Sequence, residues 1–282
     1  MKRKKAICIA CILLSAIFTA GGIAGSIWIE REIHFTPEYE RIDLAPILEK
    51  ETLCPEDYKT LFYQTGLGRR AVDQLRTQED FTAQITAFQE AFFGGASAAR
   101  CYRAGISARM EHTVDEDGRN TAGFSLAPYE EGYVVAMFSS HSFGWRHGHA
   151  GLITGSNRVL EAPILGVPAG EYRLNTWREY PTFVMLRLKD ASEEELEKIA
   201  DDALKNLTGV DYSPLAGVLH KYSGRRPATT QCAHLVWHAF YTAGYDIDST
   251  GGNIVTVWDL VNSELFEVVQ IYGLDPDRLW RE

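Results

Sequence analysis

The chain has 282 residues, of which 45% are hydrophobic and 23% charged, a composition typical of a globular protein with a sizeable core. The formal net charge is −10, and the one dense group of cations is Lys2, Arg3, Lys4 and Lys5. An acidic body without a basic stripe excludes nucleic acid as an expected partner.

Residues 6–29 carry no charge, and as a helix these residues would reach about 36 Å, more than the ~30 Å hydrocarbon layer of a membrane. We therefore predict a single-pass transmembrane anchor within residues 1–30, with a cleaved signal peptide and secretion as the alternative. Basic residues before the segment and Glu30-Arg31-Glu32 after it place the N-terminus in the cytoplasm. The remainder is then expected outside the cytoplasm.

Residues 31–123 are predicted to form a helical extracytoplasmic region. An apolar stripe after Pro55 predicts a first helix that stops near Gly66. A second helix is expected with Thr77 as its N-cap, because apolar side chains recur at helical spacing until Gly94: Phe81, Ile85, Phe88 and Phe92. The polar stretch 113–123 marks the boundary. The role of this region is left open.

From residue 124 the pattern changes to short strands, followed by two helices. The strands are expected at residues 133–138, 149–154, 158–162 and 182–188. A capping box of Ser192 and Glu195 opens a helix that ends before Gly209. The last helix is expected to begin at Cys232, with Thr229 or Thr230 as its cap, and to end at Gly244. These elements predict an α+β fold with a small antiparallel sheet packed on helices.

Cys232 is the candidate nucleophile. The first turn of a helix offers unpaired N–H groups and the positive end of the helix dipole, and both favour a thiolate. A buried, inert thiol is the alternative. Outside the N-terminal segment the other cysteines are Cys54 and Cys101, and the sequence leaves open whether they pair.

His149 and Glu161 are the candidate partners of Cys232. His149 stands in GHAGLI, on a short apolar strand, and Glu161 stands in RVLEAP, on the next strand. If the two strands form a hairpin, the carboxylate can lie beside the imidazole, orient the ring and stabilise its cation.

Taken together, these motifs resemble the circularly permuted NlpC-type branch of the papain-like cysteine hydrolases. The resemblance rests on GHAGLI, VLEA and QCAHLVW in that order and covers about residues 124–270. The related lecithin retinol acyltransferases have a second histidine where this chain has Glu161. The usual serine after the cysteine is replaced by Ala233, and the common Gly-Asp before the first strand reads Gly132-Tyr133. The resemblance implies a permuted papain-like domain over residues 124–282.

The resemblance also implies a mechanism. His149 would hold Cys232 as an ion pair, Glu161 would be the third member of a triad, and the thiolate would form an acyl-enzyme. Tyr212, in GVDY, is a candidate second donor to the oxyanion beside the N–H of Cys232. Trp145 and His147 precede the histidine strand and are candidates for shaping the substrate cleft. No metal or other cofactor is required.

The expected function is hydrolysis of amide or peptide bonds by a membrane-anchored extracytoplasmic enzyme, with the peptides of cell-wall peptidoglycan as candidate substrates. One alternative is a lipid acyl hydrolase or acyltransferase with the same triad, and another is a non-catalytic, membrane-tethered binding module. A metal hydrolase is a further reading, because His147 and His149, and His234 and His238, have ligand-like spacing.

Overall fold

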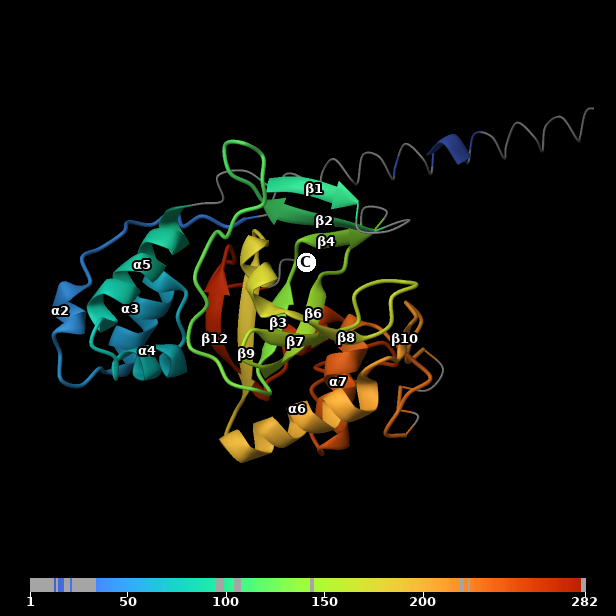
Figure 1. The fold of residues 1–282 in the computed structure, drawn as a ribbon. Coiled ribbons are helices and arrows are strands. Elements are labelled where there is room, and N and C mark those ends of the chain that lie inside the picture. The colour runs from blue at the N-terminus through green and yellow to red at the C-terminus, as the bar shows by residue number, and fades with distance from the viewer. Residues whose placement is uncertain are drawn as a thin grey trace, which may run out of the picture.

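The computed structural model describes residues 13, 15–17, 21, 34–94, 99–103, 108–142, 145–218, 221–222 and 224–279. Within them the fold is α+β, as the strand and helix patterns predicted. A six-stranded sheet forms the centre, a four-stranded sheet lies at one end of it, and helices cover the central sheet and flank its edge (Figure 1).

The central sheet is antiparallel throughout, in the order β12-β9-β3-β6-β7-β8. Six strands make it larger than the small sheet that the sequence predicted. Its strands are β3 (Val134–Met137), β6 (His149–Gly155), β7 (Arg158–Glu161), β8 (Gly170–Arg173), β9 (Phe183–Leu188) and β12 (Phe266–Tyr272). The apolar runs of β3, β6 and β9 are buried along almost their whole length, because helices and loops cover both faces.

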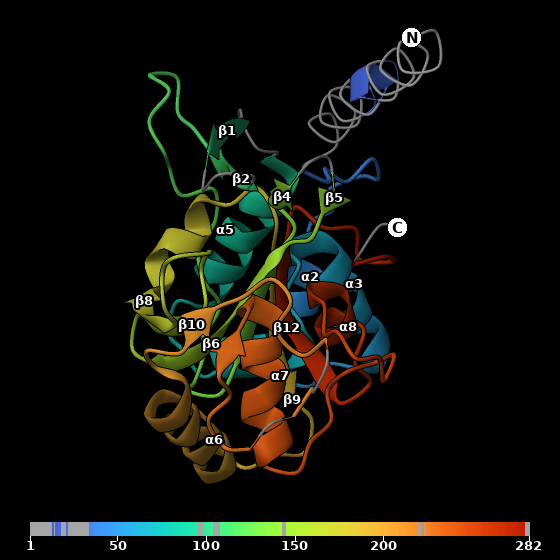
Figure 2. The same ribbon diagram turned by 90° about the vertical axis from the view of Figure 1, so that its right-hand side faces the viewer.

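Two helices, α6 (Glu193–Leu207) and α7 (Cys232–Thr242), pack against β6 (Figure 1, Figure 2). The predicted N-cap of α6 is confirmed at Ser192, which accepts a hydrogen bond from the N–H of Glu195. The predicted reciprocal bond of the capping box is not made, because the Glu195 carboxylate accepts from the Tyr245 hydroxyl instead. The predicted cap of α7 is wrong. Gln231 caps this helix instead of Thr229 or Thr230, which form the short strand β11 and pair with β10 (Asp211–Tyr212). A short helix, α8 (Val257–Val261), follows α7.

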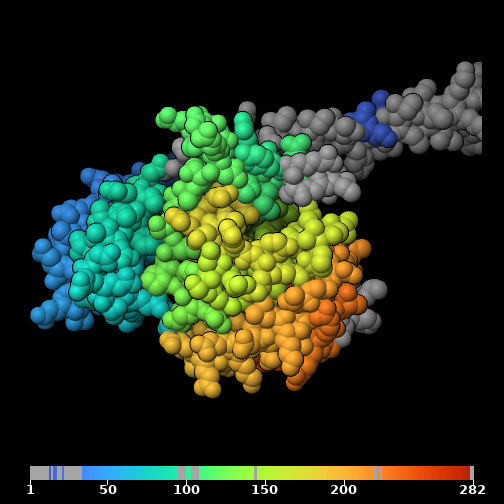
Figure 3. Space-filling model, viewed as in Figure 1, coloured from blue at the N-terminus to red at the C-terminus, as the bar shows by residue number. Residues whose placement is uncertain are grey.

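Four helices form a lobe beside β12 (Figure 1, Figure 3). They are α2 (Ala45–Leu48), α3 (Pro55–Thr65), α4 (Arg69–Leu75) and α5 (Phe81–Gly94). The lobe touches the sheet closely at Gly68, whose N–H donates to the carbonyl of Val269 at 2.9 Å. The expected N-cap at Thr77 is wrong, because α5 begins at Phe81 and the Thr77 hydroxyl donates to the carbonyl of Gln74.

The region 31–123 is not helical throughout, so this prediction is wrong at its C-terminal end. The strands β1 (Ala99–Arg103) and β2 (Ala108–Thr113) form a hairpin there, and β2 pairs with β4 (Ser140–Ser142), which pairs with β5 (Trp145–Arg146). A buried ion pair joins these strands, because Glu111 accepts two hydrogen bonds from Arg146, at 2.8 and 2.9 Å. Tertiary pairing therefore decides the conformation of a segment with little periodicity of its own.

The fold-class prediction also included an N-terminal transmembrane helix, and this part is corrected. Within the part of the chain that the structure describes, no helix is both long and apolar enough to cross a membrane. Residues 6–29, to which the prediction refers, lie almost entirely outside the described residues.

Candidate active site

The first side chain of the site, His149, begins the central strand β6 and is 4% exposed. In the β6–β7 hairpin Gly151 lies level with Glu161, so His149 and Glu161 are diagonal neighbours across the two strands. Gly151 leaves room for this approach, because an added Cβ would lie 3.1 Å from Cγ of Glu161 and 2.6 Å from Cγ2 of Val159. Close packing against Val159 and Glu161 thus explains the second glycine of GHAGLI, Gly151.

The predicted contact between His149 and Glu161 is present. Nε2 of the imidazole donates to Oε2 of the carboxylate at 2.7 Å, and Glu161 is only 7% exposed. A buried, charge-assisted hydrogen bond of this length fixes the ring orientation and leaves Nδ1 as the nitrogen available to a second partner.

Cys232 lies close enough to this ring for its sulfur to raise the pKa of His149. The thiol itself donates to Oε1 of Gln231 at 3.4 Å. Cys232 is the first residue of α7 and is 9% exposed. The cap residue Gln231 holds this helix end, because its Oε1 accepts the N–H of Ala233 at 2.8 Å and its Nε2 donates to the carbonyl of Val255 at 2.6 Å. The structure therefore brings Cys232, His149 and Glu161 together in one buried group, in which His149 is hydrogen-bonded to Glu161.

The electrostatics of this group favour a charged imidazole. Burial lowers the pKa of His149, because it penalises the cation. Hydrogen bonds to Cys232 and Glu161, together with their negative charges, outweigh this effect and raise the pKa of His149 to about 10. The site is thus built to hold an imidazolium beside a sulfur atom at neutral pH.

Tyr212 lies within the electrostatic range of Cys232. Parallel pairing of β10 with β11 sets Tyr212 level with Thr230, two residues before Cys232. Burial, and to a lesser extent the negative charge of Cys232, raise the pKa of Tyr212, so its phenol stays protonated. No hydrogen bond of its hydroxyl to another described residue is recorded, which leaves the phenol suited to donate to a ligand.

Trp145 and His147 lie on the β4–β5 hairpin and its exit, outside this buried group. Trp145 is 66% exposed, and its ring lies 5.7 Å from that of His147. His147 is bound to its own hairpin, through Ser142 Oγ at 3.0 Å and the carbonyl of Gly148 at 2.8 Å. Burial lowers the pKa of His147, so it is a neutral neighbour of the site.

Sequence reasoning missed two residues of the site, Gln231 and Trp177. Trp177 lies in a short 3₁₀ helix, η1 (Leu174–Glu179), and its Nε1 donates to Oε1 of Glu161 at 2.8 Å. A short irregular segment has no periodicity from which to predict such a contact. The position of Gln231 directly before Cys232 was the available signal for the second residue.

The histidines considered as metal ligands do not converge. Nε2 of His234 donates to the carbonyl of Lys221, and Nε2 of His238 donates to that of Gly224, each at 2.8 Å. Among the residues with a described position, no group of three or more His, Cys, Asp or Glu side chains is arranged to hold a metal ion. The two histidines instead fasten a loop to α7.

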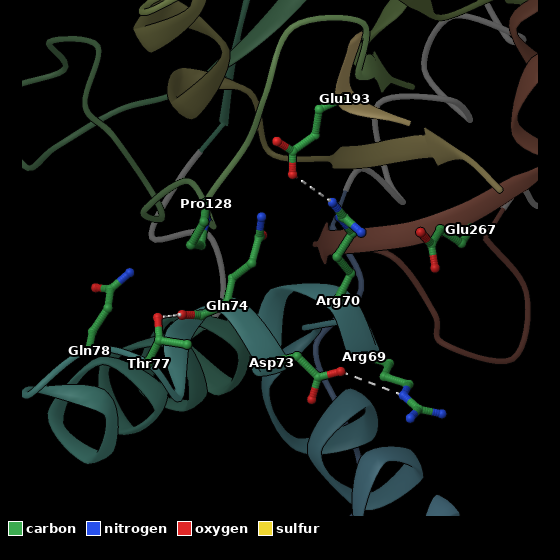
Figure 4. A pocket seen from close by; sticks show the side chains of 9 residues that line it. All are labelled: Arg69, Arg70, Asp73, Gln74, Thr77, Gln78, Pro128, Glu193 and Glu267. Atoms are coloured by element: carbon green, nitrogen blue, oxygen red, sulfur yellow. Dashed lines mark hydrogen bonds and ion pairs between the residues drawn. The ribbon is translucent and has the colours of Figure 1, made fainter. Parts of the chain in front are cut away.

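A cavity of about 640 Å³ lies away from this site, between α4, the loop before β3, the start of α6 and β12 (Figure 4). Charged side chains line it, and Arg70 is held there by Glu193 at 3.8 Å. Its lining contains no cysteine or histidine, so a cysteine–histidine pair like that of Cys232 is absent from it.

Comparison with known proteins gives little further information. No protein-family model matches the chain, and no curated protein matches it. Among solved structures it is similar to the metalloprotein yiiX (DUF1105) from Escherichia coli O157:H7, with 16% identity and a TM-score of 0.37. The match covers 50% of this chain and 96% of that one. A similarity this low supports no inference about the fold or the activity of the chain.

Proposed function

We propose that the protein is a cysteine hydrolase that cleaves amide bonds through an acyl-enzyme on Cys232. The observation that supports this proposal is the buried group of Cys232, His149 and Glu161, in which the imidazole donates to the carboxylate at 2.7 Å. A nucleophile, a base and a carboxylate that orients the base are the three parts that covalent acyl transfer needs.

In the first half of the reaction, the thiolate of Cys232 attacks the carbonyl carbon and forms a C–S bond. The resulting oxyanion accepts the backbone N–H of Cys232, and the protonated phenol of Tyr212 is the candidate for a second hydrogen bond. His149 then gives the proton on Nδ1 to the leaving nitrogen as the C–N bond breaks. An amine leaves, and a thioester remains.

In the second half, neutral His149 takes a proton from water, and the hydroxide formed attacks the thioester. The C–S bond breaks, the carboxylic acid leaves, and the thiolate–imidazolium pair is restored. Glu161 stabilises the imidazolium through its hydrogen bond at 2.7 Å. No step requires a group from outside the chain other than water.

The substrate class follows from the resemblance seen in the sequence, which favours peptide amides such as those of cell-wall peptidoglycan. The same chemistry serves lipid esters and thioesters, because only the leaving atom changes. A panel that contains short peptide amides, acyl esters and acyl thioesters separates these possibilities by kcat/KM.

The experiment is to incubate the full chain with this panel and to record both product and the mass of trapped acyl-enzyme. Cys232→Ser and His149→Ala should each lower turnover at least about 10³-fold, since removal of a nucleophile or its base costs that much or more. The matched control is Cys101→Ser, the same change at a partly buried thiol outside the site. Turnover that survives in Cys232→Ser, or no turnover and no acyl adduct on any member of the panel, would refute the proposal.

A further inference from the structure

The side chain of Trp177 closes the site from the side of Glu161. It is 1% exposed, and its indole plane lies nearly parallel to the His149 imidazole, with 5.5 Å between ring centroids and 19° between planes. Its Nε1 donates to Oε1 of Glu161 at 2.8 Å, while His149 donates to Oε2. One residue therefore contacts both partners of the nucleophile.

The carboxylate of Glu161 is consequently held from two directions. Each of its oxygens accepts one short N–H bond, so rotation about the terminal bond would break both. A carboxylate that is fixed in this way presents one oxygen to His149 with little loss of rotamer entropy. The indole face also lies within the distance at which an aromatic ring attracts a cation, and this favours the charged imidazole.

The position of Trp177 is tied to the same hairpin that carries the two residues it contacts. Asn157, in the β6–β7 turn with a φ of 56°, accepts hydrogen bonds at both its backbone and side-chain oxygens. The donors are the N–H groups of Leu174, at 3.2 Å, and Asn175, at 2.8 Å, which begin η1. On its other side the indole meets Tyr180 edge to face.

We propose that Trp177 is a positioning residue of the Cys232 site, which acts by fixing Glu161 and thereby the charge and orientation of His149. This inference rests on the proposed function. Trp177 would then be the fourth residue of the site, after Cys232, His149 and Glu161, and the one that the segment η1 contributes.

The test is Trp177→Phe, which keeps an aromatic ring but removes the N–H donor. Trp237→Phe is a closely matched control, because Trp237 is also 1% exposed and also donates Nε1 to a carboxylate, that of Asp246, at 2.8 Å. Lys221 Nζ lies 4.8 Å from the centroid of the Trp237 ring, so the control indole also has a positive charge beside it, as Trp177 has His149.

The readout is the rate constant for iodoacetamide alkylation of Cys232 in the full chain, measured from pH 5 to 9. Loss of one hydrogen bond to a charged group predicts a rate about tenfold lower near pH 6.5 in Trp177→Phe, and no more than a twofold change in Trp237→Phe. In a Glu161→Gln background Trp177→Phe should change the alkylation rate less than about twofold, because the carboxylate through which Trp177 acts on His149 is already absent.

A profile of Trp177→Phe that matches that of Trp237→Phe, or an effect of the same size in both backgrounds, would overturn the inference. A second measurement needs no tryptophan variant: the indole N–H resonance of Trp177 should move in Glu161→Gln and in His149→Ala, and a resonance unmoved in both would contradict the role. If the alkylation rate of Cys232 in the wild type does not depend on His149, the proposed function itself fails. If that dependence is present and Trp177→Phe is silent, the role of Trp177 alone fails.

Discussion

Replacement of Glu161 by glutamine changes the charge of the site with almost no change in shape. The wild-type carboxylate accepts from His149 at 2.7 Å and from Trp177 at 2.8 Å. A glutamine side chain has one acceptor and one NH₂ group, so in either orientation its NH₂ meets an N–H. At least one of the two hydrogen bonds is lost, and the negative charge that favours the imidazolium is lost with it.

The magnitude follows from the strength of such bonds. A hydrogen bond to a charged group contributes about 1.5–3 kcal/mol, and each 1.4 kcal/mol is a factor of ten. We therefore expect the population of the thiolate–imidazolium pair, and with it the alkylation rate of Cys232 near pH 6.5, to fall about 10- to 150-fold in Glu161→Gln. The pKa of His149 should fall from about 10 in the same variant, because the carboxylate is one of the groups that raise it.

The assay is time-resolved alkylation of the full chain, with the modified peptide quantified by mass spectrometry. The control is Glu171→Gln, the same substitution on the adjacent strand β8, where the carboxylate accepts from Thr154 at 3.0 Å. It should leave the rate within about twofold. A folded Glu161→Gln protein that is alkylated as fast as the wild type, or an equal loss in Glu171→Gln, would refute the assigned role of this carboxylate.

Three further predictions concern stability. A Cβ at Gly68 would lie 1.8 Å from a backbone oxygen of β12, so Gly68→Ala should lower the unfolding free energy by about 1–3 kcal/mol or more. Gly94→Ala is the control and should be near neutral, because a Cβ there would meet nothing within 4 Å. Equal urea midpoints for the two variants would contradict the docking of the helical lobe on β12. Glu111→Gln breaks the buried ion pair with Arg146 and should lower the free energy of unfolding by about 3 kcal/mol, the low end for such pairs because the Arg146 side chain is 21% exposed. A loss below about 0.5 kcal/mol in urea unfolding would show that the ion pair does not stabilise the fold. The raised pKa of His149 stabilises the folded state fully below its unfolded value of 6.5, and this stabilisation is lost as the pH rises toward about 10. The stability difference between wild type and His149→Gln should therefore shrink as the pH rises through that window, and a constant or growing difference would be contrary to it.

Sequence reasoning located the catalytic candidates because each has a local signature. Cys232 opens a helix, His149 follows a glycine on an apolar strand, and Glu161 interrupts the next strand. Their convergence needed only the hairpin between β6 and β7 and the packing of α7 on β6. Regular elements with clear periodicity made both of these predictable.

The parts that escaped prediction depend on tertiary contacts. Residues 99–103 and 108–113 have no strong strand pattern, and the buried pair of Glu111 with Arg146 helps to hold the second of these strands in a sheet. Trp177 reaches Glu161 from an irregular turn whose position is set by Asn157. Gln231 caps α7 although glutamine is not among the usual cap residues. In each case a single long-range or side-chain contact decides the structure.

The central claim is that Cys232 and His149 form a thiolate–imidazolium pair. The most direct measurement is the pH dependence of iodoacetamide alkylation at Cys232 in the full chain, with and without His149→Ala, using the exposed Cys54 as an internal reference. We expect rapid modification of Cys232 well below pH 8, loss of that reactivity in His149→Ala and no change at Cys54. Modification of Cys232 only at high pH, or only after unfolding, or at the same rate without His149, would show that the two side chains do not form this pair.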